Sequence, residues 1–320
     1  MDDLALLTEL APVAERNLER HLDATKVWYP HTMVPWSRGE DFEPEYEWDP
    51  NEAEVPEAVR AALYVNLLTE DNLPYYFRDI HRMYGYADGA WGEWTRRWTA
   101  EEGRHAMVIR DYLMVTRSID PVWLEDGRMA QIQSGKVPEP PSAAHGFAYL
   151  SLQELATRIA HRNTGKLLTD RAGYEVMAKV ATDENHHFLF YRDMAKAALE
   201  VDPSGMMKAI ADEVRGFAMP GLGIPGFVEH SKAIANAGIY DLVLHHEQIL
   251  VPVVLRHWDI ENVEGLDAEA EQARDKVLNY IKRAGRVAAR FVAKREEAAA
   301  KEPQTADAWH RREQAREFGS

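Results

Sequence analysis

The sequence predicts an all-α protein, and three observations support that prediction. Apolar residues recur at helical spacing over most of the chain, as Leu4, Leu7 and Leu10 do near its start. No stretch alternates apolar and polar residues convincingly as a half-buried strand would. The helical stretches are separated by segments rich in Pro, Gly and Ser, which are typical of loops. At 320 residues the chain can bury a large helical core.

The first half of the chain begins with an amphipathic helix, expected over residues 3–21. Residues 28–50 are then dense in Pro and aromatic side chains and show no period. We interpret this part of the chain, taken as residues 26–52, as an irregular wrap docked on the body of the protein. From residue 56 to about 121 the pattern is helical again, with a break expected near "YGYADGAWG".

The second half alternates long helices with loops. Pro/Gly-rich loops are expected over residues 132–146 and 218–227. Long helices are expected over about 147–164 and 170–201, and helices resume after the second loop. We interpret the chain up to about residue 300 as a single domain. Residues 301–320 are charged and have few bulky apolar groups, so we predict a flexible tail there.

Composition excludes several classes of protein. The chain has no Cys, which excludes disulfides, iron–sulfur clusters and thiol nucleophiles, so any metal must be held by His and carboxylates. Electrons for redox chemistry would have to come from another protein or a bound cofactor. The net charge of −16 argues against a nucleic-acid partner. The longest apolar run, "ILVPVVL", is too short to span a membrane, and the acidic start "MDD" is unlike a secretory signal. We therefore expect a cytoplasmic protein.

Two Glu-x-x-His pairs are the first sign of a metal site. Glu102 and His105 form one pair, and Glu184 and His187 form the other. Residues spaced i, i+3 project from one face of a helix. Among thirteen His, chance alone would supply roughly one such pair at ordinary Glu frequency. The pairs by themselves are therefore weak evidence.

The surrounding pattern strengthens this evidence. Glu70 lies 32 residues before Glu102, and Glu154 lies 30 residues before Glu184, each in a preceding predicted helix. One Glu from each of two helices plus Glu-x-x-His from each of two others is the ligand set of a di-iron or di-manganese site in a four-helix bundle. Oxygen donors with some nitrogen suit iron or manganese better than copper or zinc. The alternative is that these are evenly spaced acids exposed to solvent.

Pro74 leaves two possibilities for the helix that carries Glu70. Within a continuous helix its ring would clash with the carbonyl group of Glu70 and kink the helix. Alternatively, Pro74 begins a new helix after Glu70. The sequence leaves both possibilities open.

Four motifs resemble those of a known family. "TEDNLP", "WTAEEGRH", "SLQELATRIAHRNTGK" and "ATDENHH" are similar to the motifs of the soluble acyl-acyl carrier protein (ACP) desaturases, which are stearoyl-ACP desaturase-like, and particularly to the actinobacterial and mycobacterial branch. The similarity runs in order from about residue 5 to beyond residue 260. It implies a ferritin-like four-helix bundle core with additional helices, and usually a homodimer.

The resemblance also implies an activity in fatty acid biosynthesis. Members of the family use a di-iron centre, O2 and two electrons from reduced ferredoxin to introduce a cis double bond into a saturated acyl chain carried on ACP. We therefore expect two Fe ions per subunit, in preference to manganese or a mixed Mn/Fe pair. The resemblance implies six iron ligands, which are Glu70, Glu102, His105, Glu154, Glu184 and His187. Among them, Glu102 and Glu184 correspond to the carboxylates that bridge the irons in the family.

Further residues correspond to positions around the family's site. Thr157 matches a threonine beside the oxygen-binding face, where it could deliver a proton, although a packing role is an equal alternative. Trp28 and Asp183 resemble members of an electron path to His105. The acyl tunnel is expected to be lined by Met83, Gly146 and Phe147.

Some residues depart from the family pattern or have a simpler interpretation. Gly103 replaces the Asn that is usual between the Glu and the basic pair. Glu101 and Arg104 are expected to point away from the metal face, and His161 is interpreted as structural. Because ACP is acidic, a basic patch is needed to bind it. The candidates are the cluster of Arg158, Arg162, Lys166 and Arg171 and the segment 280–295, although either could be an ordinary solvated helix face.

Other functions remain open from the sequence. A ferritin-like iron-binding protein would need the metal ligands but not the N-terminal wrap. The small subunit of ribonucleotide reductase has a related architecture but typically uses Asp as its first ligand, where this chain has Glu70. A weakly active desaturase homologue is the third alternative.

Overall fold

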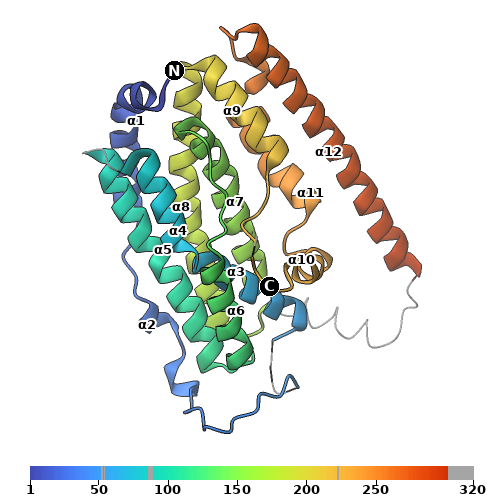
Figure 1. The fold of residues 1–320 in the computed structure, drawn as a ribbon. Coiled ribbons are helices and arrows are strands. Elements are labelled where there is room, and N and C mark those ends of the chain that lie inside the picture. The colour runs from blue at the N-terminus through green and yellow to red at the C-terminus, as the bar shows by residue number, and fades with distance from the viewer. Residues whose placement is uncertain (52, 54, 86–88, 222, 302–320) are drawn as a thin grey trace.

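The computed structural model describes residues 1–51, 53, 55–85, 89–221 and 223–301, and these residues contain helices but no strand (Figure 1). The predicted all-α class is therefore confirmed. The long helices are α1 (Asp3–Ala24), α5 (Ala90–Val115), α7 (Ala143–Leu167), α8 (Arg171–Val201) and α12 (Ala268–Lys301). The shorter α-helices are α2 (Pro30–Met33), α3 (Glu57–Glu70), α4 (Leu73–Ile80), α6 (Pro121–Ser134), α9 (Pro203–Gly216), α10 (Phe227–Asn236) and α11 (Leu242–His245). Two π-helical segments, η2 (His81–Gly85) and η3 (His246–His257), and two 3₁₀ turns, η1 (Trp36–Arg38) and η4 (Ile260–Asn262), complete the elements.

Helices α3, α5, α7 and α8 form the bundle that positions the candidate site. Helices α7 and α8 make the most extensive contact, while α3 packs on α5 and α7, and α5 packs on α8. Helix α1 lies against α8 and α5 (Figure 1). The bundle is closed by fully buried side chains, among them Leu63, Phe147 and Phe190. Burial of apolar surface of this kind is the main contribution to the stability of the bundle.

Polar side chains fix where the bundle helices begin. The Ser142 side chain accepts a hydrogen bond from the backbone N–H of His145, and Asp170 accepts one from Gly173, so α7 and α8 begin with N-caps. Helix α7 starts four residues earlier than predicted, and α6 continues to Ser134. The predicted loop over residues 132–146 is therefore limited to 135–142.

The two possibilities for Pro74 are resolved. Helix α3 ends at Glu70, and a separate helix α4 begins at Leu73 with Pro74 in its first turn. Proline is well tolerated there because the first N–H groups of a helix have no partner within the helix. Glu70 therefore lies at the C-terminal end of α3.

The N-terminal wrap contains the short elements α2 and η1 and contacts the bundle through aromatic rings. Trp28 is 8% exposed. The Trp48 indole N–H donates to the Arg117 carbonyl oxygen at 2.9 Å, and the Arg117 guanidinium lies over the Tyr46 ring. The predicted tail from residue 302 onward lies outside the described residues.

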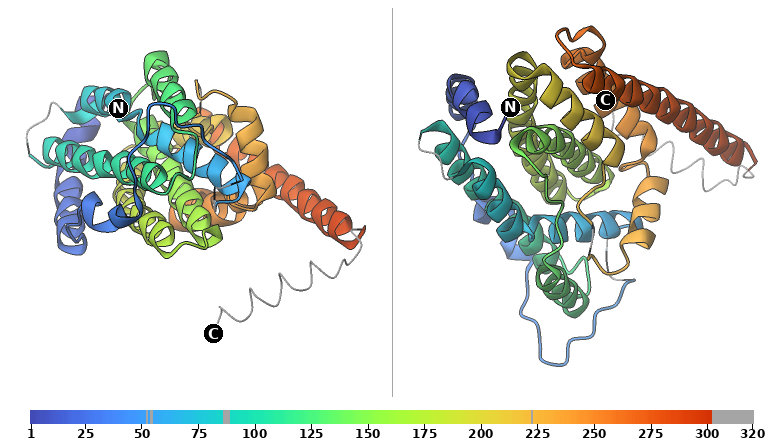
Figure 2. Two further views of the ribbon diagram at one scale, coloured as in Figure 1. Left: turned by 90° about the horizontal axis from the view of Figure 1, so that it is seen from below. Right: turned by 45° about the horizontal axis from the view of Figure 1, so that its top comes forward.

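The C-terminal elements form an outer layer on the bundle. Helix α12 packs on α9 and on η3, and its C-terminal half extends beyond the body of the protein (Figure 2). After α9, residues 217–221 pass the C-terminal end of α3, where the Thr69 hydroxyl donates to the Pro220 carbonyl oxygen at 3.3 Å. Within the described residues, no helix combines the length and the apolar character needed to cross a membrane.

Candidate metal centre

Six buried side chains meet in the middle of the four-helix bundle. Glu70 comes from α3, Glu102 and His105 from α5, Glu154 from α7, and Glu184 and His187 from α8. All are less than a tenth exposed. The i, i+3 spacing on α5 and α8 places each Glu beside its His on the inner face of the helix. The structure therefore brings together all six residues that the sequence predicts as metal ligands.

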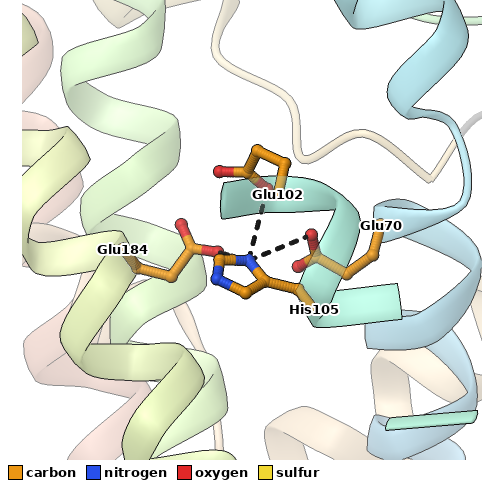
Figure 3. Close-up of side chains that lie close together, drawn as sticks. All are labelled: Glu70, Glu102, His105 and Glu184. Carbon is orange, nitrogen blue, oxygen red and sulfur yellow. Dashed lines mark ion pairs between the residues drawn. The ribbon is translucent and has the colours of Figure 1, made fainter. Parts of the chain in front are cut away.

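These side chains form two groups of four that share two members. In each group, one donor atom from every residue lies within 4.8 Å of the others. The first group is Glu70, Glu102, His105 and Glu184 (Figure 3). The second is Glu102, Glu154, Glu184 and His187. Glu102 and Glu184 are common to both groups, so these two carboxylates lie between the two positions that a metal pair would take.

Both imidazoles present Nδ1 to the carboxylates. His105 Nδ1 lies 3.3 Å from Glu102 Oε2, 3.3 Å from Glu184 Oε1 and 3.6 Å from Glu70 Oε2. His187 Nδ1 lies 2.7 Å from Glu102 Oε1 and 3.7 Å from Glu154 Oε2. In Figure 3 the three carboxylates of the first group converge on the His105 ring.

The proton affinities of these groups reflect burial and mutual charge. Burial and the Glu184 carboxylate raise the pKa of Glu102 and, more strongly, that of Glu154. Burial would lower the pKa of His105, but the adjacent carboxylates outweigh it and raise this pKa well above its usual value. The same balance raises the pKa of His187, chiefly through Glu101 and Glu102. Four carboxylates in so dry a volume need compensating positive charge.

The donor set fits two divalent ions. His105 Nδ1, His187 Nδ1, Glu102 Oε1 and Glu154 Oε2 are buried and face other members of the cluster without forming a well-directed hydrogen bond among the described residues. Buried polar atoms left in this state cost free energy, and a bound cation would compensate them. Four carboxylates offset the charge of two divalent ions, and each ion would receive one imidazole. Because no sulfur donor is present, the set favours iron or manganese.

On one side of the cluster, His105 contacts a buried carboxylate. His105 Nε2 lies 3.5 Å from Asp183 Oδ2, and the Trp28 indole N–H donates to the same oxygen at 2.7 Å. Arg104 donates to it at 3.0 Å and also stacks on the Trp28 ring. Trp28 and Asp183, predicted as a pair from the sequence, therefore lie in contact beside His105.

On the other side, Glu101 contacts the second imidazole. Glu101 Oε2 lies 3.0 Å from His187 Nε2 and 2.9 Å from His21 Nε2, and Arg97 pairs with the other carboxylate oxygen at 2.6 Å. The expectation that Glu101 points away from the site is therefore wrong. A signal was available, because Glu101 and Asp183 each immediately precede the shared Glu of their motif.

Comparison with known proteins establishes the family. The family model described as fatty acid desaturase matches residues 2–309. The chain belongs to the fatty acid desaturase family. Acyl-[acyl-carrier-protein] desaturase DesA1 of Mycobacterium tuberculosis is 43% identical over 292 residues, covering 88% of this chain and 86% of that protein. The stearoyl-[acyl-carrier-protein] 9-desaturase of Simmondsia chinensis is 32% identical over 289 residues, covering 84% of this chain and 72% of that protein.

A solved structure is similar over most of the chain. The X-ray structure of the acyl-ACP desaturase DesA2 from Mycobacterium tuberculosis H37Rv aligns with a TM-score of 0.68 at 27% identity. The alignment covers 84% of this chain and 99% of that chain. This likeness confirms the predicted ferritin-like helical fold.

His161 is a second residue near the desaturase site whose position the sequence did not suggest. It is 1% exposed, and its Nε2 lies 3.0 Å from Glu70 Oε1 and 3.8 Å from Glu184 Oε1. Its place on α7, seven residues after Glu154, puts it on the same helix face two turns further on. That spacing is the signal that could have identified it.

The remaining predicted residues lie around the cluster. Thr157 Oγ1 is 2.8 Å from Glu184 Oε2. Met83 and Gly146 touch, because a Cβ atom built on Gly146 would lie 2.8 Å from Met83 Sδ, and Phe147 is fully buried beside them. A cavity of about 30 Å³ adjoins the carboxylates. Its other lining includes Tyr76, Trp98, Tyr149 and Leu150 rather than Met83, Gly146 or Phe147.

Proposed function

We propose that this protein is an acyl-ACP desaturase that introduces a cis double bond into a saturated acyl chain carried on acyl carrier protein. One observation carries the proposal. The protein buries two groups of four metal-ligating side chains that share Glu102 and Glu184. The chain that carries them is 43% identical to acyl-ACP desaturase DesA1. A storage protein of the ferritin type would share the ligands, but the relatives named above are desaturases.

The six clustered residues would hold two irons. In this assignment, Glu70 and His105 would help to hold one ion and Glu154 and His187 the other, and Glu102 and Glu184, which belong to both groups of donors, would contribute to both. Acid–base groups alone cannot remove hydrogen from an unactivated methylene at neutral pH. When bound, the irons would supply the oxidising power for this step, using O2 and two electrons.

Protein side chains position the substrate and control access to the site. Trp98 and Leu150 place apolar surface beside the carboxylates, and Trp98 also donates to Glu154 Oε1 at 3.1 Å. An alkyl chain held against these side chains would be positioned by shape, and water would be excluded. Thr157 can exchange a proton with the Glu184 carboxylate at 2.8 Å. We propose that electrons arrive through Trp28, Asp183 and His105.

A basic groove between α9 and α12 supports ACP as the partner. It has a volume of about 400 Å³ and is lined by Arg215, Lys276, Asn279, Arg283 and Arg286. An acidic carrier is attracted to such a groove even though the whole chain carries a net charge of −16. In the alternative cluster, Arg171 pairs with Glu175 and Arg162 donates to the Tyr174 hydroxyl. Reduced ferredoxin as the donor and a homodimer as the functional state rest on the family resemblance.

Product analysis tests the proposed activity. The protein is reconstituted with ferrous iron and supplied with ferredoxin, its reductase, O2 and acyl-ACPs of graded chain length. We expect one cis double bond in the fatty acid released from at least one of them. Glu154→Ala should abolish the product, whereas Glu175→Ala, at an exposed position on α8, should retain it. Two irons per chain with no unsaturated product at any chain length would overturn the proposal and favour iron storage.

Charge reversal tests the docking surface. The double variant Arg283→Glu, Arg286→Glu should raise KM for acyl-ACP more than tenfold and change kcat little, since the reacting groups are untouched. Arg171→Glu lies in the alternative cluster and is the matched control. A raised KM only in the Arg171 variant would assign docking to that cluster instead.

A further inference from the structure

Three tryptophans lie on one face of helix α5. Trp91, Trp94 and Trp98 follow the spacing i, i+3, i+7, so their side chains form a ladder along the helix. They are 3%, 0% and 3% exposed. Two helical turns separate the first from the last, a rise of about 10.5 Å. The ladder therefore extends from the candidate metal centre towards the beginning of α5.

The inner end of the ladder contacts the metal cluster. The Trp98 indole N–H donates to Glu154 Oε1 at 3.1 Å, and the centroid of the Trp98 ring lies 6.4 Å from that of the His187 ring. The Trp94 ring meets the same imidazole edge-on, with 6.1 Å between centroids. These two indoles therefore contact the imidazole that the proposed path for arriving electrons, through His105, does not use.

Trp94, in the middle of the ladder, is held by aromatic neighbours. Its ring stacks on Phe190 with 3.6 Å between centroids and 6° between planes. Its N–H donates to the Tyr191 hydroxyl oxygen at 3.1 Å. This hydrogen bond favours positive charge on the indole, because a charged N–H group is the stronger donor. Close packing around the ring also limits rearrangement when an electron leaves it.

The outer end of the ladder packs into a second aromatic group. The centroid of the Trp91 ring lies 5.4 Å from that of the Tyr84 ring. The Tyr84 hydroxyl donates to the Tyr191 hydroxyl at 3.1 Å, which connects this group back to the middle of the ladder. The Trp91 N–H donates to the Leu7 carbonyl oxygen at 3.1 Å. Aromatic contacts are therefore continuous from the metal cluster to the place where α5 meets α1.

The indoles suit one-electron oxidation better than the two tyrosines do. An oxidised phenol releases its proton and needs a base to accept it, whereas an oxidised indole can keep its proton. Among the described residues, the Tyr84 and Tyr191 hydroxyls bond to each other and to the Trp94 N–H, and none of these groups is a base. The chain also has no Cys, so no thiol competes with the indoles as an electron source.

The cavity beside the cluster explains why such a route is needed. It has a volume of about 30 Å³, and Trp98 lines it together with Glu154. An oxidant formed there without an acyl chain has protein side chains as its reaction partners. Loss of one electron from an indole can be reversed, whereas oxidation of a metal ligand would damage the site.

We propose that Trp98, Trp94 and Trp91 form a relay that carries oxidising equivalents away from the irons when no acyl chain is bound. The inference rests on the proposed function, in which the irons react with O2, and goes beyond it by assigning a route that protects the metal site. One electron passes from the inner indole to the oxidised site, which is thereby reduced by one electron. The indole keeps its N–H proton and carries the positive charge. Electrons from the next indoles move this charge outward to Trp91, which a one-electron reductant such as ascorbate or a thiol in solution returns to its neutral state.

Electron paramagnetic resonance tests the relay. The iron-loaded, reduced protein is mixed with O2 in the absence of acyl-ACP and frozen within milliseconds. We expect an organic radical whose signal narrows when the tryptophan rings carry deuterium and stays the same when the tyrosine rings do. Trp94→Phe keeps a ring that can stack but is not readily oxidised, so the radical yield should fall several-fold. Trp123→Phe is the matched control, since this tryptophan lies on α6 and stacks on Tyr64 with 4.0 Å between centroids; its radical yield should match the wild type.

Peptide mass spectrometry provides a second readout. After repeated cycles of reduction and exposure to O2 without acyl-ACP, the wild-type protein should collect oxidation at Trp91. Trp94→Phe should collect it at Trp98 and His187 instead, and should lose iron-binding capacity faster than the wild type. Trp91→Phe removes the outer end alone, so the radical should persist and the oxidation should move inward to Trp94. This second variant tests the relay even when Trp94→Phe does not fold.

Three results would overturn the relay. They are iron oxidation by O2 without any organic radical, a radical that tryptophan deuteration leaves unchanged, or the same radical yield and oxidation pattern in both ladder variants as in the wild type. Failure of the proposed function gives a different result. Acyl-ACP would then stay saturated while the tryptophan radical still formed, which would remove the desaturase and keep the relay. Iron that stays ferrous in O2 would overturn both.

Discussion

The Glu101 carboxylate lies 3.0 Å from His187 Nε2, on the side of the imidazole opposite the clustered carboxylates. Asp183 lies in the corresponding position beside the other imidazole, with its Oδ2 atom 3.5 Å from His105 Nε2. Each acid immediately precedes the shared Glu of one motif and contacts the His of the other motif. Helices α5 and α8 therefore orient each other's imidazoles.

This relationship predicts a role for Glu101 in holding metal. Glu101→Gln should weaken binding of the iron that His187 would hold by about 10–100-fold. This is the usual effect of removing the carboxylate that orients a ligating His. His21→Ala should have a smaller effect in the same direction, since His21 contacts Glu101 at 2.9 Å. Anaerobic iron titration measures both affinities. Glu175→Gln on α8 is the control, and an unchanged affinity in Glu101→Gln would show that the acid does not position His187.

Trp28→Phe tests the proposed electron path. The change keeps an aromatic ring and removes the N–H that donates to Asp183 at 2.7 Å. We expect iron content to be unchanged, and turnover supported by ferredoxin to fall at least about tenfold, which corresponds to about 1.4 kcal/mol on the barrier. Single-turnover product formation after chemical reduction should be retained. Equal losses in both assays would mean that Trp28 stabilises the site without carrying electrons.

Gly146→Ala is expected to change chain-length preference. The added Cβ would lie 2.8 Å from Met83 Sδ, the far end of a flexible side chain that can move. The displaced thioether would fill space in the predicted acyl tunnel, so activity should shift toward shorter acyl-ACPs. Adding Met83→Ala should reverse the shift. An unchanged product distribution would place the end of the tunnel elsewhere.

Gly103 is not required by the space around it. A Cβ atom there would meet only Leu73 Cδ2, at an ordinary 3.8 Å. Gly103→Ala should therefore raise the free energy of unfolding by about 0.5–1 kcal/mol through helix propensity. Gly127→Ala is the contrasting control. Its added Cβ would clash with the buried Tyr64 hydroxyl, so this substitution should lower the free energy of unfolding. Denaturant unfolding of the two variants checks both signs.

Local sequence patterns were sufficient for much of the fold. Helical periodicity predicted α1 and α8 closely, and the i, i+3 spacing predicted which side chains of α5 and α8 face each other. The early start of α7 was missed because a single Ser142 cap outweighs the loop-like composition around it. The π-helical segment η3, which contains Pro252, was also missed, since apolar periodicity does not distinguish such a segment from an α-helix.

The surroundings of the site were harder to predict because they depend on contacts between distant residues. His21 and Glu101 are 80 residues apart in sequence and meet only when α1 packs beside α5. His161 contacts Glu70 across 91 residues.

The most direct test of the central claim is the number of irons that one chain binds. Anaerobic titration of the metal-free protein with ferrous iron should saturate at two irons per chain, because the two groups of donors share Glu102 and Glu184. Saturation at one iron, or at none, would contradict the assignment of these six residues to a pair of metal ions.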